Sequence, residues 1–99
     1  FASVSLFLSC DSLESVSMPI ATEVQEFVFA WCSSLTEVSL PAVRDVGELA
    51  FQVCRNLEAV SLPSLDSVDS TAFSACYRLS KERITAPERV KNSLPDSFI

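Results

Sequence analysis

Residues 50–63 read AFQVCRNLEAVSLP, and the same pattern returns along the chain at a constant interval. The four cysteines mark that interval, because each stands 22 residues after the one before it. The Phe, Leu, Val and Pro positions around each Cys keep the same spacing, so one unit reads F-x-x-C-x-x-L-x-x-V-x-L-P-x(4)-V. A period of roughly 20 to 50 residues is typical of solenoids and repeat arrays, in which each unit stacks on its neighbours.

The L-x-x-V-x-L part of each unit predicts a short β-strand. Its Val and its second Leu are two residues apart, so both point to one face of a strand. The following Pro ends the strand, because it cannot donate a ladder hydrogen bond. Strands of successive units are expected to pair in parallel, roughly 4.8 Å apart. The residue between Val and Leu faces the other way and is polar in each unit: Ser17, Ser39, Ser61 and Arg83.

The F-x-x-C part predicts a short helical or 3₁₀ turn on the opposite, convex side, since residues three apart share one side of a helical turn. Stacking then places the Phe rings one above another as an internal ladder, with the Cys side chains packed beside it. The members of this core ladder are Phe29, Phe51, Phe73, Cys10, Cys32, Cys54 and Cys76.

These repeats resemble the leucine-rich repeats of the BspA-like, or treponemal-type, subclass, which is marked by A-F-x-x-C-x-x-L-x-x-V-x-L-P. Residues 50–63 and 72–79 carry that motif, whereas Val28-Phe29 replaces Ala-Phe in the first full unit. The resemblance covers residues 1 to about 95. It implies an α/β leucine-rich solenoid of about four coils, with a parallel sheet on the concave face and short helical or 3₁₀ turns on the convex face.

The chain is expected to divide into repeat coils over residues 1–79 and a degenerate last repeat with a C-terminal cap over residues 80–99. Glu82 occupies the core Val position at the 22-residue spacing, and Thr85 stands where Pro is expected. Ile84 keeps the Leu position of the motif. Terminal repeats are usually atypical, because they cover the open end of a core.

Both ends of the chain suggest how the stack is closed. We expect Phe98 and Ile99 to fold back as a lid over the last coil. No comparable cap precedes the first coil, which favours a fragment of a longer protein. Apolar surface exposed there would invite end-to-end self-association.

The four cysteines allow three interpretations. A ladder with one Cys per coil spreads the sulfurs over roughly 15 Å. The ligands of one zinc ion lie about 2.3 Å from it, so a zinc site is rejected and no cofactor is expected. Disulfides Cys10–Cys32 and Cys54–Cys76 are conceivable, because neighbouring coils bring the Cα atoms to about 5 Å. Buried reduced thiols are the favoured interpretation, since free Cys packs as a small hydrophobe.

Composition argues against catalysis. The 99 residues include no His, which excludes Ser-His and Cys-His mechanisms, and one Gly, which leaves no phosphate-cradling loop. Glu14, Glu37 and Glu58 lie on or near the strand segments, but an open solenoid face implies no pocket for acid–base chemistry. The chain is therefore expected to be non-enzymatic.

Charge is unevenly distributed along the chain. Thirteen acidic and seven basic residues give a net charge of -6, which argues against nucleic acid, because phosphate binding needs clustered Lys and Arg. Residues 1–77 carry a net charge of -8 and residues 78–99 one of +2. Such segregation can serve solubility alone, or it can steer a cationic partner or head-to-tail attraction. The longest apolar run is too short to insert into a membrane.

Outward-facing strand positions form a candidate concave binding surface, because solenoids bind extended partners on such surfaces. Trp31 and Tyr77 are possible aromatic anchors at positions that vary between repeats. We expect Trp31 to be partly buried and Tyr77 to be exposed. The surface comprises Glu14, Ser15, Ser17, Thr36, Glu37, Ser39, Glu58, Ala59, Ser61, Lys81 and Arg83.

The resemblance implies a cell-surface or secreted microbial protein, since several members of that subclass are adhesins or host-interaction proteins. A cytoplasmic location stays open. We therefore expect a non-enzymatic protein-interaction or adhesion module, part of a larger protein, with a protein partner. The alternatives are a passive structural spacer or assembly element, and a targeting or regulatory domain of a larger enzyme.

Overall fold

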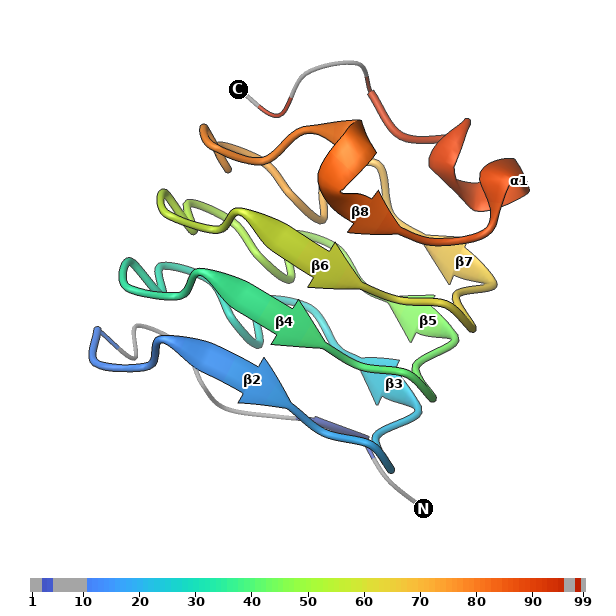
Figure 1. Cartoon of the computed structure of the whole chain (residues 1–99), viewed down its shortest axis with the longest axis horizontal. Coiled ribbons are helices and arrows are strands. Elements are labelled where there is room, and N and C mark those ends of the chain that lie inside the picture. Colours follow the sequence, from blue (N-terminus) through green and yellow to red (C-terminus); the bar gives the residue numbers. More distant parts are fainter. Residues whose placement is uncertain (1–2, 5–10, 96–97, 99) are drawn as a thin grey trace.

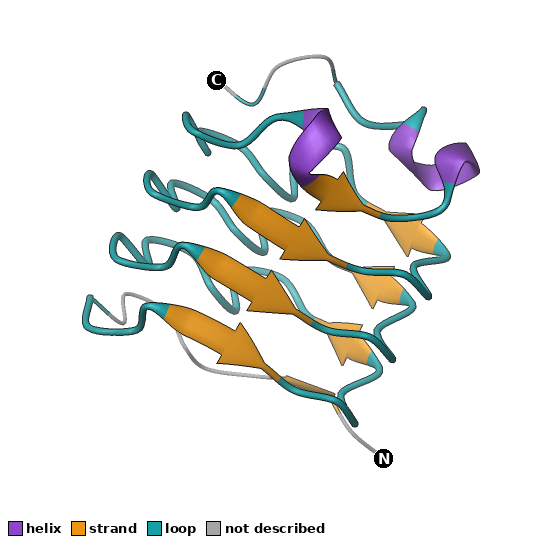
Figure 2. Ribbon diagram, viewed as in Figure 1, coloured by secondary structure: helices purple, strands orange, loops and turns teal. Residues whose placement is uncertain are grey.

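The computed structural model describes residues 3–4, 11–95 and 98 of the chain. The chain winds into stacked coils, and each full coil contributes one strand to each of two parallel sheets (Figure 1). The parallel-sheet solenoid expected from the repeats is confirmed. A single sheet was expected, however, and the structure has two, which Figure 2 shows as separate rows of strands.

The first sheet contains the strands that the sequence predicts. Three of its strands repeat at an interval of 22 residues, so that Val16, Val38 and Val60 align and point into the core. The residues on either side of each Val point outward, as alternation in a strand requires. The strands, in sheet order, are β2 (Ser15–Ser17), β4 (Glu37–Ser39), β6 (Ala59–Ser61) and β8 (Ile84–Thr85).

The second sheet lies on another side of each coil. Val24 and Val46 are buried in it and Val68 is half-buried, which gives the Val at the end of the repeat motif its structural role. Each strand is only two residues long, too short for alternating hydrophobicity to mark it in the sequence. The strands, in sheet order, are β1 (Ser3–Val4), β3 (Glu23–Val24), β5 (Asp45–Val46) and β7 (Ser67–Val68).

The F-x-x-C segments, expected as short helical or 3₁₀ turns, form consecutive turns without a regular helix. Some backbone hydrogen bonds do run from the N–H of residue i+3 to the carbonyl oxygen of residue i. For example, the Cys54 N–H donates to the Phe51 carbonyl oxygen at 3.3 Å. A helix cannot continue, because left-handed residues interrupt each segment. The residues with positive φ are Phe27 (62°), Trp31 (64°), Leu49 (53°), Val53 (57°) and Ala75 (60°).

Backbone hydrogen bonds join these turns from one coil to the next. The turns therefore form a third stacked side of the solenoid, in addition to the two sheets. The N–H groups of Phe27, Phe29 and Trp31 donate to carbonyl oxygens of the next coil, over distances of 2.7–3.2 Å. Phe51 and Val53 repeat the pattern one coil later. Backbone pairing therefore continues where no regular strand exists.

Stacked phenylalanine rings fill the interior. Phe29, Phe51 and Phe73 have no exposed surface. The first two ring centroids lie 5.1 Å apart with an interplanar angle of 7°, and the next pair is 5.2 Å apart at 9°. Phe98 contacts Phe73 edge-on, with centroids 5.7 Å apart at 67°. Phe98 thus follows the ladder at its end, whereas Ile99 lies outside the described residues.

The last repeat leaves the 22-residue spacing, contrary to the register expected for it. Val60 pairs with Ile84, and Ser61 pairs with Thr85, an offset of 24 residues. The two extra residues are taken up by the 3₁₀ helix η1 (Lys81–Arg83), so Glu82 does not occupy the core Val position. Ile84 takes the Val position instead of the Leu position, and Thr85 takes the outward position that was assigned to Arg83.

Beyond β8 the chain turns into the short helix α1 (Glu88–Lys91), whose Arg89 contacts Asp66 just before β7. Val90 of this helix and the following Leu94 are buried. Nη2 of Arg89 lies 3.0 Å from Oδ1 of Asp66, and the same carboxylate is 3.9 Å from Nη2 of Arg44. Apolar contacts and an exposed ion pair together attach this segment to the coils.

Candidate functional site

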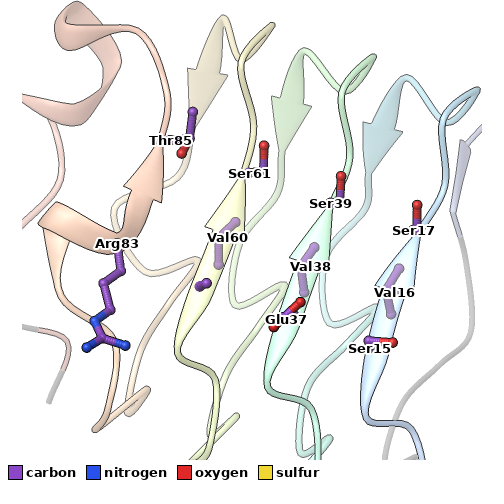
Figure 3. Close-up of a pocket in the computed structure, with 11 residues that line it drawn as sticks. Ser15, Val16, Ser17, Glu37, Val38, Ser39, Val60, Ser61, Arg83 and Thr85 are labelled. Atoms are coloured by element: carbon purple, nitrogen blue, oxygen red, sulfur yellow. The ribbon is translucent and has the colours of Figure 1, made fainter.

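The outer side of the β2-β4-β6-β8 sheet carries a shallow, open depression of about 300 Å³, which we call the serine face. One row along it consists of the hydroxyl groups of Ser17, Ser39 and Ser61, followed by Thr85 (Figure 3). The row is straight because these residues are directly paired across neighbouring strands. The complete lining is Ser15, Val16, Ser17, Glu37, Val38, Ser39, Ala59, Val60, Ser61, Arg83 and Thr85.

A second row on the serine face carries opposite charges. Ser15, Glu37 and Ala59 align across the strands. Arg83, which directly precedes β8, lines the same depression (Figure 3). Nη1 of Arg83 is 3.6 Å from Oε1 of Glu58, an exposed pair of modest strength. Among the described residues, Glu37 has no ion-pair partner, so its carboxylate is available to a bound molecule.

The structure brings seven of the eleven predicted surface residues together on the serine face. Glu14, Thr36, Glu58 and Lys81 do not line the depression. The Thr36 N–H and hydroxyl both donate to the Glu14 carbonyl oxygen, at 2.8 and 3.1 Å, so this position bonds the coils to each other.

Sequence reasoning missed Thr85 as a residue of the serine face, because it assumed an unbroken 22-residue spacing. Ala86-Pro87 provides a signal that could have found it. With two inserted residues, this dipeptide stands at the Leu-Pro position of the motif, and Ile84 then falls at the Val position.

The two candidate aromatic anchors lie away from the serine face. Trp31 is 49% exposed and therefore lies more at the surface than the partial burial expected for it, and Tyr77 is 60% exposed. Neither lines the depression. Phe27 and Ile20 are further exposed apolar side chains that the sequence did not single out.

The described cysteines are buried inside the coils and unbridged. They are Cys32, Cys54 and Cys76, whereas Cys10 lies outside the described residues. Hydrogen bonding with the Cys76 thiol, together with burial, raises the pKa of Cys54 far above its ordinary value. A protonated, enclosed thiol is a poor nucleophile, so Cys54 serves packing.

The described residues keep their charged side chains at the surface. Residues 11–95 and 98 bury no polar or charged side chain. Within the same part of the chain, no three His, Cys, Asp or Glu side chains converge as metal ligands would. The serine face therefore presents hydroxyl groups, one free carboxylate and one guanidinium over an open surface.

A sequence model of the BspA type leucine rich repeat region matches residues 3–98, in six copies. The chain belongs to this family. BspA-type repeats typically form non-enzymatic protein-interaction modules, and their proteins are typically found at the cell surface or secreted. No curated protein and no solved structure compared with the chain matches it. Among the described residues of this BspA-type chain, no helix has the length and apolar character that a bilayer crossing requires.

Proposed function

We propose that this BspA-type chain is a non-enzymatic adhesion module of a microbial surface or secreted protein, and that it binds an extended segment of a protein partner on the serine face. The observation that carries the proposal is the continuity of that face. Four adjacent strands present aligned polar side chains across one open depression.

The chemistry of the serine face suits a polar, extended ligand. Each hydroxyl group can donate one hydrogen bond and accept others, so the row can pair with backbone amides and carbonyls of a peptide. Glu37 on the central strand β4 and Arg83 near the β8 end give the face opposite charges at different points. Complementary charges on a partner would fix its direction along the face.

We further propose that residues 80–99 act as the C-terminal cap of the repeat coils. Buried Val90, Leu94 and Phe98 support this role, because their side chains belong to the hydrophobic core of the coils and Phe98 contacts Phe73. The ion pair between Arg89 and Asp66 adds a polar contact at the surface.

Adhesion can be measured with beads that carry the chain and are washed over a monolayer of cultured animal cells. The variant with both Ser39→Arg and Ser61→Arg places two long cations on the serine face and should reduce bead retention by about fivefold or more. The control variant carries Ser12→Arg and Ser64→Arg, at exposed positions outside the depression, and adds the same charge. Equal retention of both variants would contradict binding at the serine face, and a wild type that never adheres would favour a structural spacer.

A further inference from the structure

The outer side of the second sheet carries a separate groove of about 640 Å³, which we call the acidic groove. Strands β3, β5 and β7 and the residues after them form it. Its charged lining residues are all carboxylates: Glu23, Glu26, Asp45, Glu48 and Asp69. No Lys or Arg is among the described residues that line this groove.

Several of these carboxylates are held next to one another by the repeat. Glu23 and Asp45 are directly paired in neighbouring parallel strands, and Glu26 and Glu48 stand at the same 22-residue interval. Like charges placed directly opposite in a sheet repel each other. Arg44, which directly precedes Asp45 in the sequence, lies 3.9 Å from Asp66 instead. The groove thus carries negative charge that no described cation neutralises.

The distance over which the carboxylates are spread indicates how the positive charges of a matching ligand should be spaced. Among the described residues no group converges closely enough to hold one metal ion. A groove that spans three strands, each roughly 4.8 Å from the next, instead distributes its charge over about 10 Å. An extended peptide repeats its same-side side chains every roughly 6.6–6.8 Å, so two basic side chains would fit along this length.

An exposed aromatic residue whose backbone adjoins the groove-lining residues favours the same kind of ligand. Phe27 follows Glu26 directly, and its N–H donates to the Glu48 carbonyl oxygen at 3.2 Å. Its side chain is 39% exposed although the residue adopts a left-handed conformation. An exposed ring can receive the ammonium or guanidinium group of a ligand through a cation–π contact.

We propose that the acidic groove binds a Lys- or Arg-rich extended segment of a partner protein, at a surface distinct from the serine face. Charge complementarity provides most of the attraction, and the ring of Phe27 contacts one basic side chain. The groove would therefore act as a second interaction surface of the same solenoid, on another side of each coil.

The test uses the full chain and a fluorescein-labelled peptide of about eight residues with alternating Lys and Ser, followed by fluorescence anisotropy in about 50 mM NaCl. The variant Glu23→Gln, Asp45→Asn and Glu48→Gln should weaken binding at least about tenfold. Its matched control, Glu14→Gln, Glu82→Gln and Glu88→Gln, removes the same charge outside the groove and should stay within about twofold of the wild type. Circular dichroism melts verify that both variants fold.

Three further arms complete the test. Phe27→Leu should weaken binding about two- to threefold, because it removes the ring and Leu49 already occupies the equivalent position of the next coil. The variant with Ser39→Arg and Ser61→Arg should bind the Lys-Ser peptide as the wild type does, which keeps this proposal separable from the function proposed for the serine face. A peptide of alternating Glu and Ser should not bind.

Four results would overturn the proposal. The first is no binding of the Lys-Ser peptide at low salt, and the second is equal loss in the two triple variants, which would indicate net charge alone. The third is loss of binding in the serine-face variant, because the peptide would then occupy that face. The fourth is stoichiometric displacement of the peptide by about 0.1 mM Ca²⁺, which would assign the carboxylates to a metal.

Discussion

The Cys54 thiol lies 3.0 Å from the backbone carbonyl oxygen of Phe29, one coil earlier, and donates a hydrogen bond to it. The Cys76 thiol makes the same 3.0 Å contact with the carbonyl oxygen of Phe51. The cysteine of each of these coils therefore bonds to the backbone of the coil before it. This gives the repeating Cys a specific role, since Ala or Val at the same place would fill space without donating.

Stability should fall with pH above the ordinary thiol pKa of 9.0. The folded chain keeps Cys54 protonated because the neighbouring Cys76 thiol and burial raise its pKa, whereas the unfolded chain releases the proton. The unfolded state then binds fewer protons, so the free energy of unfolding should decrease by about 1.4 kcal/mol per pH unit for this thiol. Urea titrations between about pH 8 and pH 10 would measure the slope. Cys54→Ala should have a shallower slope, and an identical slope would refute the explanation.

Phe51→Ala should destabilise the fold by about 3–5 kcal/mol, because Phe51 is fully buried between two stacked rings. The comparison is Phe27→Ala, which removes a ring of the same size from an exposed position. The control should cost about 1 kcal/mol or less. Chemical denaturation of both variants measures the difference, and a loss below about 1 kcal/mol for Phe51→Ala would mean that the ladder is not the core.

Ala75→Gly should stabilise the protein by about 0.5–1 kcal/mol. Ala75 adopts a left-handed conformation with φ of 60°. In this conformation the steric strain of a residue with a Cβ atom costs more free energy than the extra conformational entropy that Gly loses on folding. Ala72→Gly is the matched control, because Ala72 is fully buried and its φ is not positive. That control should be destabilising. Thermal melts of the two variants should therefore shift in opposite directions.

Deleting Lys81 and Glu82 should leave the fold intact. The deletion removes the two residues that η1 inserts and restores the 22-residue distance from Val60 to Ile84. Deleting Arg55 and Asn56 removes the same number of residues from a regular coil, and should unfold the chain by breaking the pairing of β4 with β6. Far-ultraviolet circular dichroism and a cooperative melt distinguish the outcomes, and equal damage from both deletions would show that η1 is required.

The features that repeat with a clear residue pattern were predictable from the sequence. The 22-residue period, the inward Val of β2, β4 and β6, and the stacking of Phe29, Phe51 and Phe73 all follow from spacing and apolar character. The outward residues Ser39 and Ser61 of the serine face follow from strand alternation in the same way.

Three features were not predictable by the same reasoning. Strands of two residues have no alternation, so the second sheet was missed, and with it the acidic groove, although Glu23 and Asp45 recur at the repeat interval. The turns of the F-x-x-C segments depend on left-handed residues such as Trp31 and Val53, and nothing in a Trp or Val side chain indicates that conformation. The extra pair of residues in η1 moved Thr85 into the serine face, and a fixed period conceals such an insertion.

The constant register between neighbouring coils has a genetic consequence. Strand β4 pairs with β6 in the same register in which β2 pairs with β4. A coil can therefore be duplicated or lost without creating a new kind of contact between neighbouring coils. Stability in such stacks depends mainly on nearest neighbours, so a lengthened or shortened array remains foldable. Unequal crossing-over between repeats can therefore lengthen or shorten both surfaces by whole coils. The single coil is thus the unit that can be gained or lost at the level of the gene.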